Sequence, residues 1–85
     1  MCTNIATKTR VAGSAKTGSG WIPIDEVSVG FDHATHAWVE HALRIDFTSA
    51  AGTDRAAVEL DLASGRALLA KLEEVITEAE RSGVA

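Results

Sequence analysis

The sequence predicts a small α+β fold: an antiparallel sheet of three to four strands with one C-terminal helix packed on one face. Two observations lead to this prediction. Segments that alternate apolar and polar residues lie between residues 3 and 62, and a single amphipathic pattern with helical spacing follows them. With 85 residues, the chain is shorter than a typical domain of about 100–150 residues, so we expect a single domain over 1–85.

Four segments have the period-two alternation of strands that bury one face. They are residues 3–12, 27–31, 40–47 and 57–62. Residues 13–20 are rich in glycine and serine and separate the first two strands, so we expect a flexible loop there. Pro23 lacks a backbone donor, which favours an edge position or a connection for the residues around it.

The last part of the chain predicts one amphipathic helix over 64–82. The hydroxyl of Ser64 is the expected N-cap acceptor, and Gly83 is the expected C-terminal stop. Apolar residues recur at helical spacing and form one continuous stripe, while glutamates occupy the opposite side. The stripe consists of Leu68, Leu72, Val75, Ile76 and Ala79.

Composition and charge exclude several classes of protein. The apolar content of 46% excludes a disordered chain, and the net charge of −4 gives no basic surface for nucleic acid. No apolar run approaches the roughly 20 residues of a membrane span, and the N-terminus does not resemble a signal peptide. We therefore expect a cytoplasmic protein that binds neither membrane nor nucleic acid. A core this small, with one cysteine and so no internal disulfide, favours a homo-oligomer, with a dimer as the default.

All three histidines lie between residues 33 and 41. His33 continues the apolar face of the strand over 27–31, and His41 begins the apolar face of the strand over 40–47. If these strands form a hairpin, both imidazoles project from the same end of the same face, with His36 in the connection above them. Three converging imidazoles would bind a divalent metal, namely zinc, iron, manganese or copper.

Other residues near the histidines extend this metal-site hypothesis. Cys2 is a candidate fourth ligand, and Glu40 and Asp32 are candidate catalytic or orienting carboxylates. The strand phase places both carboxylates on the face opposite His33 and His41, which counts against direct ligation. A short helix over 33–41 is an alternative local structure, and it would gather His33, His36 and Glu40 on one side. The glycine-rich segment lacks the Walker A pattern, so we expect no nucleotide cofactor.

Several blocks of the sequence resemble a family of small bacterial proteins classed as a domain of unknown function. The blocks are the opening Met1-Cys2-Thr3, the Gly13-Ser14 to Gly20-Trp21 segment, and Asp32-His33-x-x-His36-Ala37-x-x-Glu40-His41-x-Leu43-x-Ile45-Asp46-Phe47. The similarity extends through Val58-Glu59-Leu60 and the helix. It implies no activity, substrate or cofactor, but it draws attention to the same positions as the histidine argument.

These observations favour a small cytoplasmic metal-binding protein, a metalloenzyme acting on a small-molecule substrate through its histidine-rich site. Two alternatives remain open at this point. One is a metal-free isomerase or lyase in which a histidine paired with a carboxylate acts as acid and base. The other is a non-enzymatic oligomeric binding or accessory module.

Overall fold

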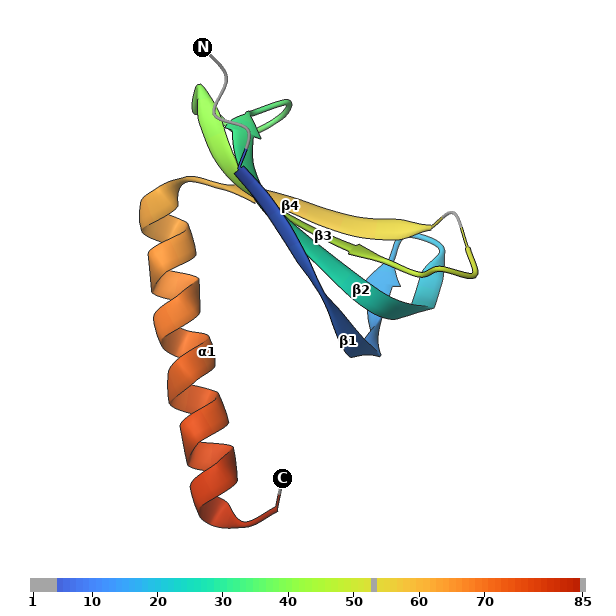
Figure 1. The fold of residues 1–85 in the computed structure, drawn as a ribbon, viewed down its shortest axis with the longest axis vertical. Coiled ribbons are helices and arrows are strands. Elements are labelled where there is room, and N and C mark those ends of the chain that lie inside the picture. The colour runs from blue at the N-terminus through green and yellow to red at the C-terminus, as the bar shows by residue number, and fades with distance from the viewer. Residues whose placement is uncertain (1–4, 53, 85) are drawn as a thin grey trace.

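Four strands and one helix make up the fold in the computed structural model, which describes residues 5–52 and 54–84 (Figure 1). The elements are β1 (Ile5–Thr17), β2 (Gly20–His33), β3 (His41–Thr48), β4 (Arg55–Leu60) and α1 (Leu62–Ser82). The strands form one antiparallel sheet in the order β1-β2-β3-β4. The α+β class predicted from the alternating segments and the single helical stripe is therefore confirmed.

The strand register gives the sheet one apolar and one polar face. Directly paired residues share a face, so Phe31, Leu43 and Leu60 form one apolar row and Val29, Ile45 and Val58 the next. On the other face, Arg44 pairs with Glu59 and Asp46 with Ala57. Ion pairs join Arg44 to Glu59 and Arg55 to Asp46 on this polar face.

The glycine-rich segment is mostly strand, so the predicted loop over 13–20 is corrected to a two-residue turn at Gly18-Ser19. A register shift between Arg10 and Gly13 resets the pairing, and the strand then continues to Thr17. The Thr17 hydroxyl closes the turn by donating to the Gly20 carbonyl at 3.0 Å. Pro23 lies in the part of β2 that pairs with β1 alone, in agreement with the expected edge position.

Helix α1 begins two residues earlier than predicted, and its N-cap is Asp61 rather than Ser64. The Ser64 N–H donates to Asp61 Oδ1 at 2.7 Å, so the carboxylate takes the role assigned to the hydroxyl. Because β4 ends at Leu60, a single residue connects strand and helix. The predicted stop at Gly83 is confirmed, since this residue has a φ of 77° and donates to Glu80 O.

The helix contacts the apolar face of the sheet only near its first turn. Gly65 is buried there, and a Cβ at this position would clash with the Leu43 side chain. Beyond this contact α1 diverges from the sheet (Figure 1). The large side chains of its apolar stripe are exposed, namely Leu68, Leu72, Val75 and Ile76. Among the described residues, the buried hydrophobic side chains are Ile22, Val27 and Ala42. No helix in that part of the chain could cross a membrane.

Candidate functional site

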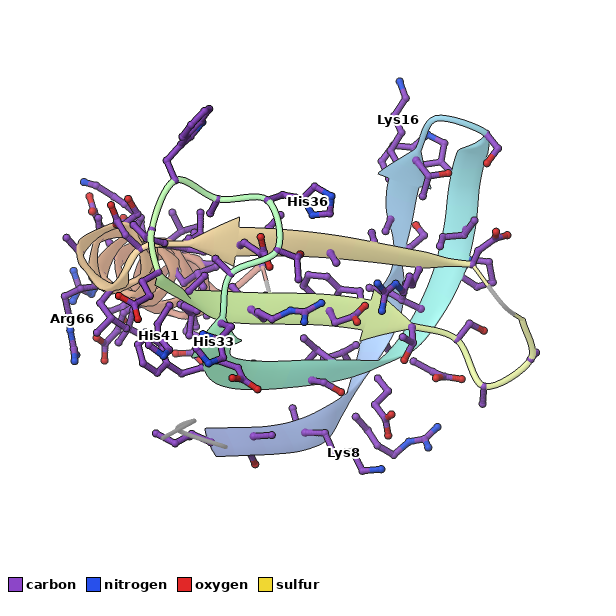
Figure 2. All side chains as sticks on the ribbon, turned by 90° about the horizontal axis from the view of Figure 1, so that it is seen from above. Lys8, Lys16, His33, His36, His41 and Arg66 are labelled. Atoms are coloured by element: carbon purple, nitrogen blue, oxygen red, sulfur yellow. The ribbon has the colours of Figure 1, made fainter. Side chains whose placement is uncertain are left out.

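His33 and His41 lie directly opposite each other at the end of the β2–β3 hairpin, as the strand phase predicts. Their ring centroids are 4.6 Å apart, with the rings inclined by 29°. Phe31 also stacks with His41, with ring centroids 5.7 Å apart. His33 is exposed and His41 is half-buried, so the pair is accessible from solvent at one edge of the apolar face (Figure 2).

His36 does not join this pair. It lies apart from His33 and His41, over the polar face of the sheet (Figure 2). Within residues 5–52 and 54–84, no group of three or more histidine, cysteine or acidic side chains could hold a metal ion. The expected convergence of three imidazoles is therefore corrected to a pair. The reason is that the connection between β2 and β3 folds over the polar face rather than above the hairpin end.

The remaining predicted site residues do not complete a ligand set around the pair. Asp32 lies on the face opposite His33 and His41, as the phase argument predicts, and its Oδ1 accepts from the His33 backbone N–H at 2.7 Å. The Glu40 side chain is exposed, and its backbone carbonyl accepts from Ala34 N at 3.0 Å. Cys2 lies outside the described residues. The alternative helix over 33–41 is wrong, because β2 continues to His33 and residues 34–40 form an irregular connection.

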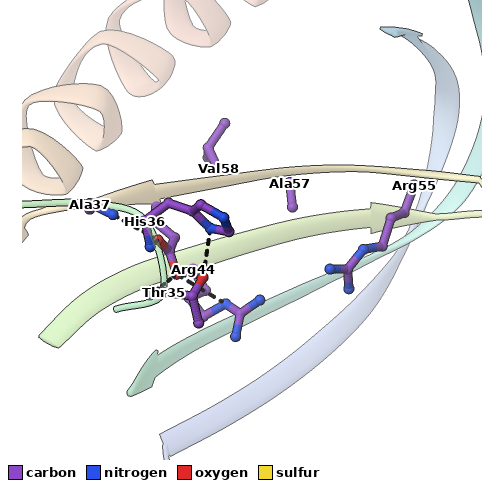
Figure 3. Close-up of a pocket in the computed structure, with 8 residues that line it drawn as sticks. Thr35, His36, Ala37, Arg44, Arg55, Ala57 and Val58 are labelled. Carbon is purple, nitrogen blue, oxygen red and sulfur yellow. Dashed lines mark hydrogen bonds and ion pairs between the residues drawn. The ribbon is translucent and has the colours of Figure 1, made fainter. Parts of the chain in front are cut away.

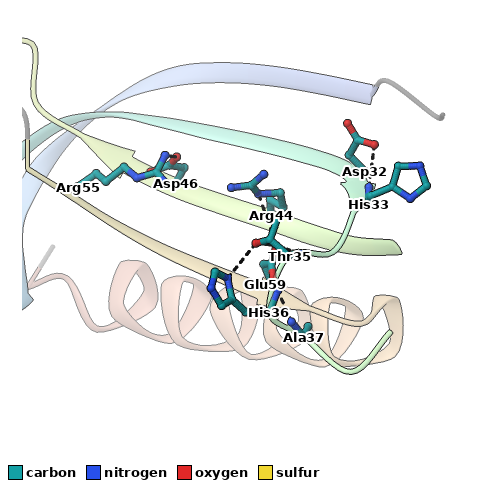
Figure 4. Close-up of polar contacts among 9 residues, drawn as sticks. All are labelled: Asp32, His33, Thr35, His36, Ala37, Arg44, Asp46, Arg55 and Glu59. Atoms are coloured by element: carbon teal, nitrogen blue, oxygen red, sulfur yellow. Dashed lines mark hydrogen bonds and ion pairs between the residues drawn. The ribbon is translucent and has the colours of Figure 1, made fainter. Parts of the chain in front are cut away.

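The connection over 34–40 is anchored by one carboxylate, that of Glu59 on β4 (Figure 4). Glu59 Oε1 accepts from the His36 N–H at 2.7 Å and the Ala37 N–H at 3.0 Å. Glu59 Oε2 accepts from both the backbone N–H and the hydroxyl of Thr35, each at 2.9 Å. Arg44 Nε lies 3.9 Å from the same oxygen. Five donor or cationic groups therefore converge on a side chain that is 11% exposed.

These donors stabilise the charged form of Glu59. Hydrogen bonds from the Thr35 and His36 backbone N–H groups are the main reason that the pKa of Glu59 falls from 4.5 to about 2, and burial opposes them only in part. The carboxylate is therefore ionised at neutral pH. It can orient neighbouring groups, but it cannot serve as a general base that cycles near pH 7.

The Thr35 hydroxyl connects Glu59 to His36. A carboxylate only accepts, so the hydroxyl donates its single proton to Glu59 Oε2. The contact of 2.9 Å between Thr35 Oγ1 and His36 Nδ1 is then donated by the imidazole. This assignment leaves the ring lone pair of His36 on Nε2. In a catalytic triad, the orienting carboxylate fixes the tautomer of its histidine in the same way.

A shallow cavity of about 490 Å³ adjoins these groups on the polar face (Figure 3). Thr35, His36, Arg44, Arg55 and Glu59 contribute to its lining. Both arginines have carboxylate partners, since Arg44 faces Glu59 and Arg55 Nη1 lies 2.8 Å from Asp46 Oδ2. The cavity has a mixed polar and apolar lining, and its charges are largely balanced within the chain.

Sequence reasoning missed Thr35 and Glu59 as members of a possible site. Glu59 appears in the sequence as one of several acidic residues on a solvated strand face, and nothing in its spacing links it to residues 35–37. The available signal was the pairing of β3 with β4, because it places Glu59 beside Arg44 at the hairpin end from which the connection departs.

Comparison with known proteins adds a family but no activity. The profile of a family described as "Family of unknown function (DUF6295)" matches residues 1–85. No curated protein and no solved structure gives a significant match.

Proposed function

We propose that this chain, which belongs to the family of unknown function DUF6295, is a small metal-binding protein whose site is built on His33 and His41. The observation that supports the proposal is the cross-strand pairing of the two imidazoles, with ring centroids 4.6 Å apart at a solvent-accessible edge. Two ligands on adjacent strands are fixed relative to each other by the sheet, which reduces the entropy that a metal must overcome to order them.

The geometry of a cross-strand pair is compatible with one shared ion. Directly opposed residues on antiparallel strands have Cβ atoms about 4.5–5.5 Å apart. Metal–imidazole bonds are about 2.0–2.1 Å long, and the χ2 torsion of histidine rotates over a broad range. Rotation of both rings out of their stacked arrangement would therefore direct one nitrogen of each toward the same ion.

The ligand type favours zinc or copper, with iron next, over manganese. Imidazole suits zinc, copper and iron, whereas manganese prefers carboxylates and water, and Asp32 lies on the opposite face. The remaining positions would hold water, a small substrate or the thiolate of Cys2, whose participation is tested by substitution. A metal with open positions would act as a Lewis acid toward a small molecule, which is the enzymatic form of this proposal. We propose the cytoplasm as its compartment.

Calorimetric titration of the untagged chain with Zn²⁺, and separately with Cu²⁺, tests the proposal. We expect binding at one site per chain, with His33→Ala and His41→Ala each weakening it at least about tenfold, because removal of a partner that only orients a ligand already costs about 10–100-fold. His36→Ala is the matched control and should bind as the unchanged chain does. The Cys2→Ser variant reports whether the thiol contributes. Unchanged affinity in both His33→Ala and His41→Ala would refute the site.

A second candidate function rests on a different observation, the chain of contacts from Glu59 through Thr35 to His36 beside the cavity on the polar face of the sheet. Here His36 Nε2 would accept a proton from a small polar substrate, while Glu59 would hold the imidazole tautomer and orientation without titrating itself. This is the metal-free acid–base alternative, with Glu59 in the role that the sequence assigned to Glu40 or Asp32.

The two candidates predict opposite outcomes in one experiment. In a screen for isomerase or lyase activity on small polar acids, a metal-free site requires His36 and Thr35 and resists chelators. A metal site loses activity in His33→Ala or on treatment with a chelator, and it recovers on addition of metal. Activity that is lost in Thr35→Val but retained in Glu40→Gln would favour the polar-face site.

A further inference from the structure

We propose that the apolar half of this protein is completed by a second copy of the chain, whose helix α1 packs against the apolar face of the first copy's sheet and against its α1. The inference goes beyond the proposed metal site and does not depend on it. It rests on the exposure of two facing apolar surfaces, on the surface area of the single chain, and on the short connection between β4 and α1.

Large apolar side chains on the helix and on the sheet are exposed together. On α1, Leu72 is 50% exposed, Val75 66% and Ile76 54%. On the sheet, Val58 is 47% exposed in the row that it shares with Ile45. Monomeric proteins rarely expose a continuous apolar surface of this kind. Both surfaces therefore need an occupant.

The area of the single chain matches what a stable dimer would remove from water. A compact monomer of 8.9 kDa exposes about 4,800 Å², whereas this chain exposes 6604 Å². The excess of about 1,800 Å² per chain, or about 3,600 Å² for two chains, lies within the range of about 2,000–5,000 Å² for obligate homodimers. The radius of gyration of 14.5 Å likewise exceeds the roughly 12 Å expected for a compact domain of this length.

The chain's own helix is not positioned to cover its own sheet. Asp61 alone connects β4 to α1, and its carboxylate is engaged as the N-cap of the helix. Gly65 brings the helix backbone against Leu43, which fixes the point and direction of departure. Closing α1 onto its own sheet would require the cap and this contact to rearrange, whereas a second copy can fill the space without changing either.

A second helix of this chain suits the surface in composition and length. Its apolar stripe is uncharged, as are the sheet rows built from Val29, Phe31, Leu43 and Ile45. An α-helix of this length spans about 31 Å, and the eight residues of β3 span about 26 Å. In a two-fold arrangement each chain supplies one helix and receives one, so both apolar surfaces are covered by the same contact.

Sedimentation equilibrium of the full chain over about 1–100 µM tests the inference, together with thermal unfolding over the same range. We expect a mass twice the 8.9 kDa of one chain and an unfolding midpoint that rises with concentration. The variant Leu72→Glu should lose the dimer, because it places a charge in the apolar stripe. The matched control Ala70→Glu, on the opposite side of the helix, should retain it.

The mass and unfolding midpoint of the unchanged chain are themselves measured over a range of concentrations. The test therefore remains decisive even if Leu72→Glu fails to fold. A single-chain mass at all concentrations, with a midpoint that does not depend on concentration, would overturn the inference. An assembly that persists in Leu72→Glu would overturn it as well, because its contacts would lie elsewhere.

Discussion

The two faces of the sheet differ in how far a single chain can complete them. On the polar face, the Glu59 carboxylate accepts four hydrogen bonds from the connection over 34–40, and Arg44 and Arg55 have carboxylate partners. On the apolar face, the helix contacts the sheet near its first turn and then diverges, leaving most of its stripe exposed. The chain completes the polar face with its own hydrogen bonds and ion pairs, whereas much of the apolar surface remains exposed.

The difference follows from the physics of the two kinds of interaction. A hydrogen bond is short and directional, so one carboxylate on β4 can organise a connection that lies beside it. Hydrophobic stabilisation scales with buried area, and an 85-residue chain has little area to bury. The faces should therefore respond differently to substitution.

The largest effect is expected from truncation on the apolar face. If a second copy covers this face, Ile45→Ala should lower the free energy of unfolding by about 2–4 kcal/mol, as for a buried isoleucine. Ser28→Ala on the polar face is the control and should change stability by no more than about 0.5 kcal/mol. Urea unfolding at a fixed chain concentration measures both.

Ile45 is half-buried in the single chain. An Ile45→Ala cost of about 1 kcal/mol or less would mean that no second copy buries it further in solution, since burial of its methyl and methylene groups would then contribute little. The contrast between the two faces would disappear.

The next effect concerns the anchor of the connection. Glu59→Gln removes the charge that four hydrogen bonds share, and we expect backbone amide exchange at Thr35, His36 and Ala37 to accelerate by on the order of tenfold. Glu40→Gln is the control, because this carboxylate in the same connection is exposed. Unchanged exchange in Glu59→Gln would show that the connection is held by other contacts.

Acid should weaken the same hydrogen bonds between Glu59 and the connection over 34–40. The pKa of Glu59 is lowered from 4.5 to about 2, so its ionised form contributes stability above about pH 4.5 that is lost as the pH falls toward 2. The stability difference between the unchanged chain and Glu59→Gln should therefore shrink between these pH values. Unfolding followed at a series of pH values measures it, and a difference that stays constant down to pH 2 would contradict the assignment.

The smallest effect is expected at the far end of the helix. Gly83 has a φ of 77°, a conformation that costs alanine about 1 kcal/mol, so Gly83→Ala should unwind only the last turn. Far-ultraviolet circular dichroism should show a slight loss of helix. A dimer that dissociates in this variant would indicate that the helix end, rather than its apolar stripe, forms the contact.

The fold was largely predictable because its signals are local. Alternation in 40–47 and the helical spacing of Leu68, Leu72 and Ile76 identify a strand and the helix, and Gly83 marks the end of the helix. The two errors had different causes. Residues 13–17 are strand because they pair with residues 20–24 of β2, which outweighs their glycine-rich composition. Asp61 rather than Ser64 is the N-cap, a choice between two capping residues only three positions apart.

The site was predictable only where side chains alternate regularly between the two faces of a strand. This alternation correctly placed His33 opposite His41, since both lie in regular strands. It could not place His36, because the path of an irregular connection depends on contacts distant in sequence, here those with Glu59. The same distance in sequence hid Thr35 and Glu59 as partners of His36.

Isotope-filtered nuclear Overhauser spectroscopy on a mixture of labelled and unlabelled chains can show whether a second copy covers the apolar face, because it detects contacts between copies alone. We expect intermolecular contacts between the methyl groups of Leu72 or Ile76 on one chain and those of Ile45 or Val58 on the other. A mixed sample in which contacts between these methyl groups occur only within one chain would contradict it.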